Sequence, residues 1–352
     1  MSRTACDVLV IGAGPAGSSA ARIAAENGAD VIMVERKALI GLPVRCAEYI
    51  PAQLPGEINL GREYIVWPVK GMRTVLPDGS LHELKSPGFT INRDVLDQTL
   101  ARAAEHAGAR IIMSASATAL VGGEVSVRHE KIEKISARII IGADGPRSRV
   151  GRWIGAVNTD LIPSVQARMR LKMPLDFTEI YFDKEFFGGY GWLFPKGSEA
   201  NVGIGRKAGP QITVSLNRLL EHFIDRLVHT GKIHPETLNR FAGWVPAAPV
   251  SNPVKDHILL VGDAAGQTHP ITGAGIAPAV ICGKIAGLRA AQAAKANDIS
   301  LLNEYAAECR DLFGDVQQRA VCRRILLEKE WNRLDEVIKK CWVSFREYYA
   351  GD

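Results

Sequence analysis

The stretch that most constrains this chain is residues 7–35, where a glycine-rich turn joins a strand to a helix. The apolar run Val8–Ile11 leads into Gly12-Ala13-Gly14-Pro15-Ala16-Gly17, a helix of small residues follows, and a second apolar run ends at Glu35. In such a βαβ unit the glycines allow a tight turn, close approach to a pyrophosphate and close helix–strand packing, while the acid can bind ribose hydroxyls. The pattern predicts an adenine dinucleotide site; a glycine-rich turn in another kind of α/β protein is the alternative.

Composition and charge narrow the class of protein further. The chain has 352 residues, 47% of them hydrophobic and 23% charged, with a formal net charge of +5. No apolar run reaches the roughly 18 residues of a membrane span and no leader is evident, which predicts a cytoplasmic protein. The charge is too small to indicate nucleic-acid binding, but it suits an anionic substrate, an acidic redox partner or an anionic membrane surface. The six cysteines lie far apart without a CxxC pair, so neither a metal site nor a disulfide framework is expected.

Two further strand ends carry a Gly-Asp pair. Residues 139–141 run into Gly142-Ala143-Asp144-Gly145, and residues 258–261 run into Gly262-Asp263. An aspartate there would stand at the carboxyl edge of a parallel sheet, where ligands of open α/β sheets bind. Either pair alone is more often a plain turn. Three such strand ends in this order, however, are much harder to explain as plain turns.

The order of the predicted elements indicates an α/β chain with a discontinuous cofactor domain. The patterns predict helices over 91–107, with Asn92 as cap, and over 214–230, and strands over 110–114, 139–141 and, antiparallel, 161–206. We expect a Rossmann-like dinucleotide-binding domain, an inserted antiparallel β-sheet domain for the substrate, and a C-terminal helical segment. The expected ranges are 1–61, 91–155 and 256–300 for the first, 62–90 and 156–255 for the second, and 301–352 for the helices.

An apolar stripe marks the C-terminal segment, surrounded by arginines and lysines. Its members recur at helical spacing and are Leu327, Trp331, Leu334, Ile338 and Trp342. A basic amphipathic helix can lie on an anionic membrane surface. More often such a stripe packs on its own domain or on a partner subunit.

The three glycine-containing motifs together resemble the flavoproteins built like p-hydroxybenzoate hydroxylase, in which they serve one FAD. The resemblance implies that Asp263 holds the ribityl chain and that Asp144 and Gly145 lie behind the cofactor. It also implies that Arg93 leads the helix that lies over the FAD. No second nucleotide fingerprint is present, so NAD(P)H would bind only transiently.

Five spaced motifs between residue 6 and about residue 290 narrow this to a resemblance to the geranylgeranyl reductase family. They are RCAE at 45–48, GYGWLFPKG at 189–197, ANVGIG at 200–205, GDAAG at 262–266 and PITGAGI at 270–276. The second is similar to the YxWxFP substrate motif of that family. The resemblance implies FAD contacts at Gly12, Gly14, Ala16, Gly17, Glu35, Arg36, Arg45, Cys46, Ala47, Arg93, Asp144, Gly145, Gly262, Asp263, Gly273, Gly275 and Ile276.

Tyr190, Trp192 and Phe194 alternate along a predicted strand, so their side chains share one face. An aromatic wall beside a flavin, with Pro195 next to it, would suit an apolar substrate such as an isoprenoid double bond. The alternative is the core of the β-domain.

Reduction of a carbon–carbon double bond needs a hydride from the flavin and a proton from an acid. We expect the catalytic residues to be Cys46, Tyr190, Trp192 and His269. Cys46, beside Arg45, either has a lowered pKa and faces the flavin or is a small buried hydrophobe. Candidate proton donors are Cys46, Glu48, Tyr190, His269, in the loop expected to line the flavin ring, and a bound water.

The expected function is therefore an FAD-dependent reductase that saturates double bonds of a geranylgeranyl-type isoprenoid or similar apolar lipid. The alternatives are an FAD-dependent monooxygenase acting on an aromatic or protein side-chain substrate, and a flavoprotein that passes electrons to a partner. The electron donor, NAD(P)H or ferredoxin, stays open, as does peripheral membrane contact. Only about 60 residues follow the stretch of similarity that ends near residue 290, fewer than in many family members, and the resemblance then implies a smaller or more open pocket.

Overall fold

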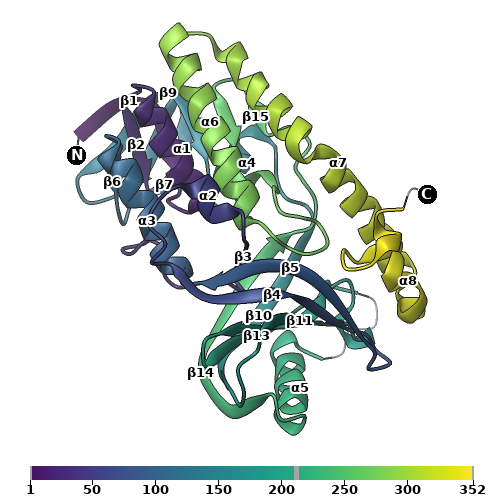
Figure 1. The fold of residues 1–352 in the computed structure, drawn as a ribbon. Helices are drawn as coiled ribbons and strands as arrows, with labels where there is room; N and C mark the ends of the chain where they lie inside the picture. Colours follow the sequence, from purple (N-terminus) through teal and green to yellow (C-terminus); the bar gives the residue numbers. More distant parts are fainter. Residues whose placement is uncertain (1, 210–213, 351–352) are drawn as a thin grey trace.

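The chain folds into two eight-stranded sheets with helices packed against them (Figure 1). The structure is a computed structural model that describes residues 2–209 and 214–350. The expected domain ranges also contain residues 1, 210–213 and 351–352, which lie outside the described part. In Figure 1 the first sheet and its helices form the upper half of the molecule, the second sheet lies below, and the C-terminal helices run down one side.

The first sheet is built on five adjacent parallel strands, in the order β16-β9-β1-β2-β6. Their central residues are apolar and buried, because long helices cover one face of the sheet and the β7–β8 hairpin with the short helix α4 (Arg149–Ile154) covers the other. Antiparallel strands extend the sheet at β15 and at the hairpin of β7 and β8. The bounds are β1 Ser2–Ile11, β2 Val31–Val34, β6 Arg110–Ile112, β7 Ser116–Val121, β8 Glu124–Arg128, β9 Ile132–Gly142, β15 Val254–Lys255 and β16 Ile258–Leu260.

The carboxyl ends of three of these strands lie side by side. Ile11 of β1 is in register with Gly142 of β9, and Gly142 is in register with Leu260 of β16. The glycine motif and both Gly-Asp pairs follow at these ends. The expectation that they meet at one sheet edge is therefore confirmed.

Close backbone contacts hold the helices of this half together. Helix α6 (Ile276–Ala296) packs on α1 (Pro15–Glu26), where a Cβ added to Gly287 would lie 2.2 Å from the carbonyl oxygen of Ala20. The predicted helix over 91–107 is present as α3, Arg93–His106. Two short helices, α2 (Leu54–Ile58) and α4 (Arg149–Ile154), complete this half.

The second sheet is mostly antiparallel and has the order β14-β10-β13-β12-β11-β4-β5-β3, with β11 and β4 parallel. Helix α5 (Leu216–His229) buries one apolar face against it. Strand β3 pairs with β5, so a segment within the expected cofactor range 1–61 contributes to the second sheet. The bounds are β3 Tyr49–Pro51, β4 Ile65–Val75, β5 Leu81–Ile91, β10 Leu161–Leu171, β11 Phe177–Tyr181, β12 Tyr190–Lys196, β13 Glu199–Gly205 and β14 Ile233–Pro246.

The C-terminal stripe packs on the protein's own β-sheet domain. Helix α7 (Leu302–Lys329) runs from beside α6 toward the second sheet and leads into α8 (Leu334–Cys341) (Figure 1). All members of the stripe are buried in one apolar cluster with Phe182 and Trp192. The stripe is therefore not a membrane-facing surface, because its apolar side chains are covered by the chain itself.

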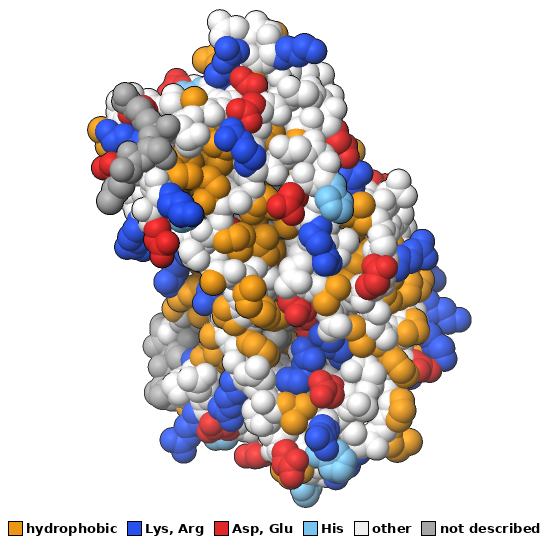
Figure 2. All heavy atoms as spheres, turned by 90° about the vertical axis from the view of Figure 1, so that its left-hand side faces the viewer, with side chains coloured by type: hydrophobic (Ala, Val, Ile, Leu, Met, Phe, Trp, Pro, Cys, Tyr) orange, Lys and Arg blue, Asp and Glu red, His pale blue; other side chains and the backbone are white. Residues whose placement is uncertain are grey.

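The opposite side of the molecule, the left-hand side of Figure 1, is shown in Figure 2. Acidic and basic side chains are interspersed on that face.

Candidate active site

A cavity of about 520 Å³ lies between the two sheets and is closed on one side by the C-terminal segment. Its wall contains the ends of the parallel strands, the loop 45–49, strand β12 and residues that follow α8. Most of the site residues expected from the sequence lie in this wall: Gly14, Ala16, Arg45, Cys46, Ala47, Arg93, Gly145, Tyr190, Trp192, Phe194, Gly262, Asp263, Gly273, Gly275 and Ile276.

The dinucleotide end of the cavity fits a pyrophosphate. A Cβ added at Gly14 would meet no atom within 4 Å, so the space in front of this glycine is open. Gly14 also begins helix α1, whose first N–H groups and positive dipole end face that space. Gly12 and Gly17 have a different role, because a Cβ on either would lie within 2.5 Å of a backbone carbonyl oxygen. They allow β1, α1 and β9 to approach one another.

Asp263 supplies an acceptor at the same end. Among the residues that the structure describes, its carboxylate has no hydrogen-bond partner, and it lines the cavity. Burial raises the pKa of this carboxyl, against the lowering by Arg93. An acceptor that lines the cavity without a protein partner fits a ligand that brings hydroxyl donors, as a ribityl chain does.

Other expected cofactor residues lie outside the cavity wall. Asp144 accepts hydrogen bonds from the Ser148 hydroxyl and from N–H groups at the start of α4, so it organises that turn. Glu35 is buried and accepts from the Ala13 and Lys37 N–H groups. Arg36, which follows it, is exposed.

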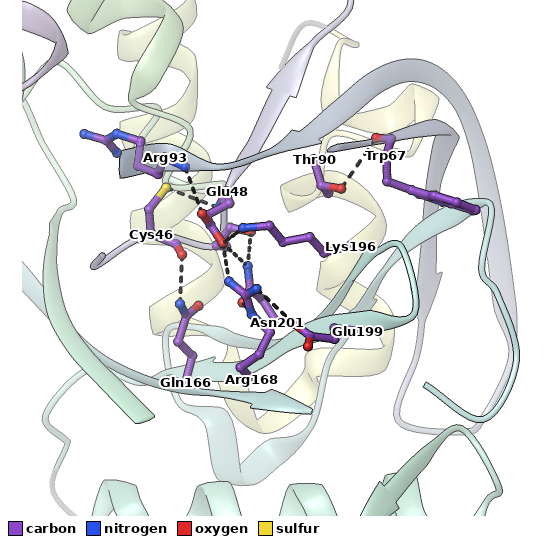
Figure 3. Close-up of polar contacts among 11 residues, drawn as sticks. Cys46, Glu48, Trp67, Thr90, Arg93, Gln166, Arg168, Lys196, Glu199 and Asn201 are labelled. Carbon is purple, nitrogen blue, oxygen red and sulfur yellow. Dashed lines mark hydrogen bonds and ion pairs between the residues drawn. The ribbon is translucent and has the colours of Figure 1, made fainter. Parts of the chain in front are cut away.

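The loop that carries Cys46 is held by a buried carboxylate. Glu48 is 1% exposed and accepts hydrogen bonds from four donors (Figure 3). They are the Arg93 N–H at 2.9 Å, the Arg168 guanidinium at 2.6 Å, the Lys196 ammonium at 2.7 Å and the Asn201 amide at 3.0 Å. A carboxylate bound by two cations is ionised. The sequence singled out Glu48 only as an acid, because its cations lie on strands distant in the chain.

The carboxylate of Glu48 also caps helix α3, a role that the sequence pattern assigned to Asn92. Asn92 occupies the cap position, but its side chain makes no capping hydrogen bond. The first N–H of the helix, that of Arg93, is instead accepted by Glu48. The missing cap is thus supplied from a different segment.

Cys46 differs from the expectation of a lowered pKa. Its thiol lines the cavity, and burial raises its pKa, while the nearby cation that lowers it is Arg93 rather than Arg45. Arg45 is exposed. The thiol therefore stays protonated at neutral pH, because burial penalises the charged form more than one cation favours it.

The aromatic wall forms as expected for Tyr190, Trp192 and Phe194, which all line the cavity. Pro195 points to the other face of β12 and lies outside the wall, as the alternation of a strand requires. The Tyr190 hydroxyl donates to the Thr272 carbonyl at 2.5 Å.

The C-terminal segment adds wall residues that the motifs did not indicate: Arg324, Trp342, Val343 and Tyr349. The Trp342 ring packs edge-on against Tyr190 at 5.2 Å, and its indole N–H donates to the Thr74 hydroxyl at 2.9 Å. In the sequence, only the helical spacing of the apolar residues in this segment indicated that it is buried. Nothing in the sequence indicated which cavity it would close.

His269 is turned away from the cavity, contrary to expectation. Its Nδ1 accepts from the Ile271 and Thr272 N–H groups, and its Nε2 contacts the Tyr348 hydroxyl at 3.3 Å. Burial lowers the pKa of His269 to about 4. Its neutral ring therefore shapes the 270–273 loop, and this placement does not support a role as proton donor.

No cluster of three metal-ligating side chains occurs in residues 2–209 and 214–350. In the same part of the chain, no helix combines the length and apolar character needed to cross a bilayer.

Replacing Gly14 by Ala should weaken FAD binding without destabilising the apoprotein. The new methyl group would occupy the open space in front of α1 and meet no protein atom, and the φ of −77° suits any residue. We expect the dissociation constant for FAD, measured by flavin fluorescence, to rise about tenfold or more. Gly56→Ala, also in open space, is the matched control and should bind FAD normally. Unchanged binding by the Gly14 variant would remove the pyrophosphate from this position.

The buried neutral His269 should make stability depend on pH. Because its pKa is about 4 in the folded protein and about 6.5 when unfolded, the unfolded chain binds the extra proton between these values. Stability should be complete above pH 6.5 and fall toward pH 4, by at most about 3 kcal/mol. Thermal unfolding of His269→Asn should show a flatter pH profile than wild type. The exposed histidine variant His222→Asn should keep the wild-type slope; equal slopes in all three proteins would contradict the assignment.

Models of known protein families match segments from both halves of the site. A model of the geranylgeranyl reductase catalytic domain matches residues 160–245, and one of FAD dependent oxidoreductases matches residues 7–41. The chain is 37% identical to the digeranylgeranylglycerophospholipid reductase of Methanothrix thermoacetophila, over 94% of this chain and 88% of that protein. Digeranylgeranylglycerophospholipid reductase 2 of Methanopyrus kandleri is also 37% identical, over 95% and 90%.

Two solved structures that resemble this chain differ in how similar their sequences are to it. The crystal structure of a geranylgeranyl bacteriochlorophyll reductase-like protein from Thermoplasma acidophilum has a TM-score of 0.86 and 30% identity, over 98% of this chain and 92% of that one. A flavin-dependent brominase, at 16% identity and a TM-score of 0.75 over 96% and 90% of the two chains, shares the fold alone. The resemblance seen in the sequence motifs is confirmed: the chain belongs to the geranylgeranyl reductase family of FAD-dependent oxidoreductases.

Proposed function

We propose that this protein reduces the carbon–carbon double bonds of geranylgeranyl chains on a glycerophospholipid. The observation that carries the proposal is the continuity of the cavity. One volume is walled by the glycine motifs and by the aromatic residues of β12, and Cys46 lines it as well. The archaeal relatives described above carry that activity in their names.

FAD, the cofactor of the family, supplies a hydride from its reduced ring when bound. Gly14 and the start of α1 would hold the pyrophosphate, and Asp263 would accept from the ribityl hydroxyls. Glu35, at the end of β2, would bind the ribose of the adenosine.

The structure favours Cys46 among the candidate proton donors. Glu48 is occupied by two cations, and the ring of His269 faces Tyr348 rather than the cavity. The Tyr190 proton is donated to the Thr272 carbonyl, and burial raises the pKa of this tyrosine. The Cys46 thiol is protonated and lines the cavity, so we assign it the proton that the second carbon of the double bond requires.

The other part of the wall suits an apolar chain. It consists largely of aromatic and aliphatic side chains, among them Met72, Ile180, Trp192 and Trp342. Burial of a chain there would contribute about 0.8 kcal/mol for each CH₂ group removed from water. The same contacts exclude water from the reacting carbons.

The experiment that tests this function is mass spectrometry of an unsaturated archaeal phospholipid incubated anaerobically with the dithionite-reduced protein, beside an aerobic sample. Dithionite makes the result independent of the natural electron donor. Products that gain pairs of hydrogens without oxygen support the proposal. An added oxygen in the aerobic sample alone would instead indicate a monooxygenase.

Replacing Cys46 by Ala should lower kcat by about 100-fold or more, the range for loss of a general acid. The flavin absorption spectrum and the melting temperature should stay close to wild type, since the thiol is small and faces the cavity. Cys322→Ala, at an exposed position of α7, is the control. Wild-type kcat in the Cys46 variant would assign the proton to another group, such as a bound water.

Replacing Trp342 by Phe should raise KM for the lipid about tenfold, because apolar contact worth about 1.4 kcal/mol is lost. The flavin spectrum should not change, since the glycine motifs are untouched. Trp331→Phe is the matched control, a buried tryptophan of the same segment outside the cavity wall. Equal KM values for both variants would exclude Trp342 from the substrate site.

A further inference from the structure

We propose that Glu48 is a positioning residue for Cys46: one ionised carboxylate clamps the two halves of the cavity together and thereby fixes the turn that presents the thiol. This inference rests on the function proposed above. Its donors come from four elements, namely the first N–H of α3 on the cofactor side and side chains of β10, β12 and β13 in the second sheet. Figure 3 shows all of them converging on the carboxylate.

Several polar groups of the short turn 46–48 are hydrogen-bonded within this cluster or next to it. The Glu48 N–H donates to the Cys46 sulfur at 3.2 Å. The Cys46 carbonyl accepts from the Gln166 amide at 2.8 Å, and the Ala47 carbonyl accepts from Asn201 at 3.0 Å. Because Asn201 binds both Ala47 and the Glu48 carboxylate, side chain and backbone are held by one group.

The backbone of Glu48 needs this support. Its φ is 68°, in the left-handed region that non-glycine residues rarely adopt. Such a conformation costs about 1–3 kcal/mol and persists only where surrounding contacts impose it. The conformation turns the chain so that Cys46, Ala47 and Glu48 all line the cavity.

Glu48 also contributes to the electrostatic surroundings of the thiol. The charged groups nearest Cys46 are Glu48, which raises its pKa, and Arg93, which lowers it and is itself paired with Asp97. Arg168 and Lys196 face Glu48 from the second sheet, Arg168 also pairs with Glu199, and Asp263 faces Arg93. Arg45 precedes the turn and is exposed. Removing the carboxylate therefore takes away a charge that raises this pKa while Arg93 remains, and this favours the thiolate.

The test measures the rate of Cys46 alkylation by iodoacetamide against pH in FAD-loaded protein, by peptide mass spectrometry. Cys322 is exposed and serves as an internal reference in each sample. The variants are Glu48→Gln, the charge-balanced Glu48→Gln/Lys196→Met, and Lys196→Met alone. The double variant keeps the protein foldable, because Arg168 retains Glu199 at 3.3 Å and one buried cation is removed with the carboxylate.

We expect the midpoint of Cys46 alkylation to move down by about one pH unit in both variants that lack the carboxylate. The profile of Cys322 should not move, and Lys196→Met alone should not shift Cys46 downward. The double variant should recover the melting temperature but not the Cys46 profile or kcat, while KM stays near wild type.

A double variant that recovers the profile and kcat together with the melting temperature would overturn the proposal and leave Glu48 as a fold anchor only. The alkylation readout needs no lipid. If wild-type protein fails to reduce any lipid while the profiles shift as expected, the proposed reaction fails and the positioning of Cys46 stands.

Discussion

Strands β1 and β9 and helix α1 meet in a close backbone contact, and the geometry of the cofactor end of the cavity follows from it. A Cβ on Gly17 would lie 1.9 Å from the Gly12 carbonyl oxygen, and one on Gly12 would lie 2.3 Å from that of Ala143. Only hydrogen side chains let the start of α1 reach the carboxyl ends of the parallel strands. Because those strand ends meet there, the positive dipole end of α1, the open space in front of Gly14 and the Asp263 carboxylate lie at the same end of the cavity.

A second constraint joins that end to the substrate sheet. Glu48 is buried together with Lys196, while Arg168 is half-buried, and the desolvation cost of such a group is offset only when each partner is hydrogen-bonded. Its donors belong to both halves of the molecule, so the relative placement of α3 and the strands β10, β12 and β13 depends on one carboxylate. Cys46, the proton donor proposed above, lies two residues away in the chain.

Much of the architecture was predictable because it rests on local patterns. The βαβ unit, the convergence of the Gly-Asp strand ends and the common face of Tyr190, Trp192 and Phe194 all follow from strand and helix periods. The expectations that the structure did not meet concern the burial of side chains and contacts between residues distant in the chain. Burial raises the pKa of Cys46 and Arg93 opposes it, Tyr348 contacts the ring of His269, and Glu48 caps α3. Each of these partners lies more than forty residues away in the chain from the group that it contacts.

Short sequence patterns predicted a dinucleotide site at the edge of a parallel sheet and an aromatic strand that accompanies it. Residue types at short spacing are sufficient for both, since each is a property of one turn or one strand. Only the packing of distant segments places Trp342 in the cavity wall, turns His269 toward Tyr348 and away from the cavity, and brings donors from four elements to Glu48. Those outcomes depend on which segments pack together, and packing between distant segments leaves no fixed spacing in the chain.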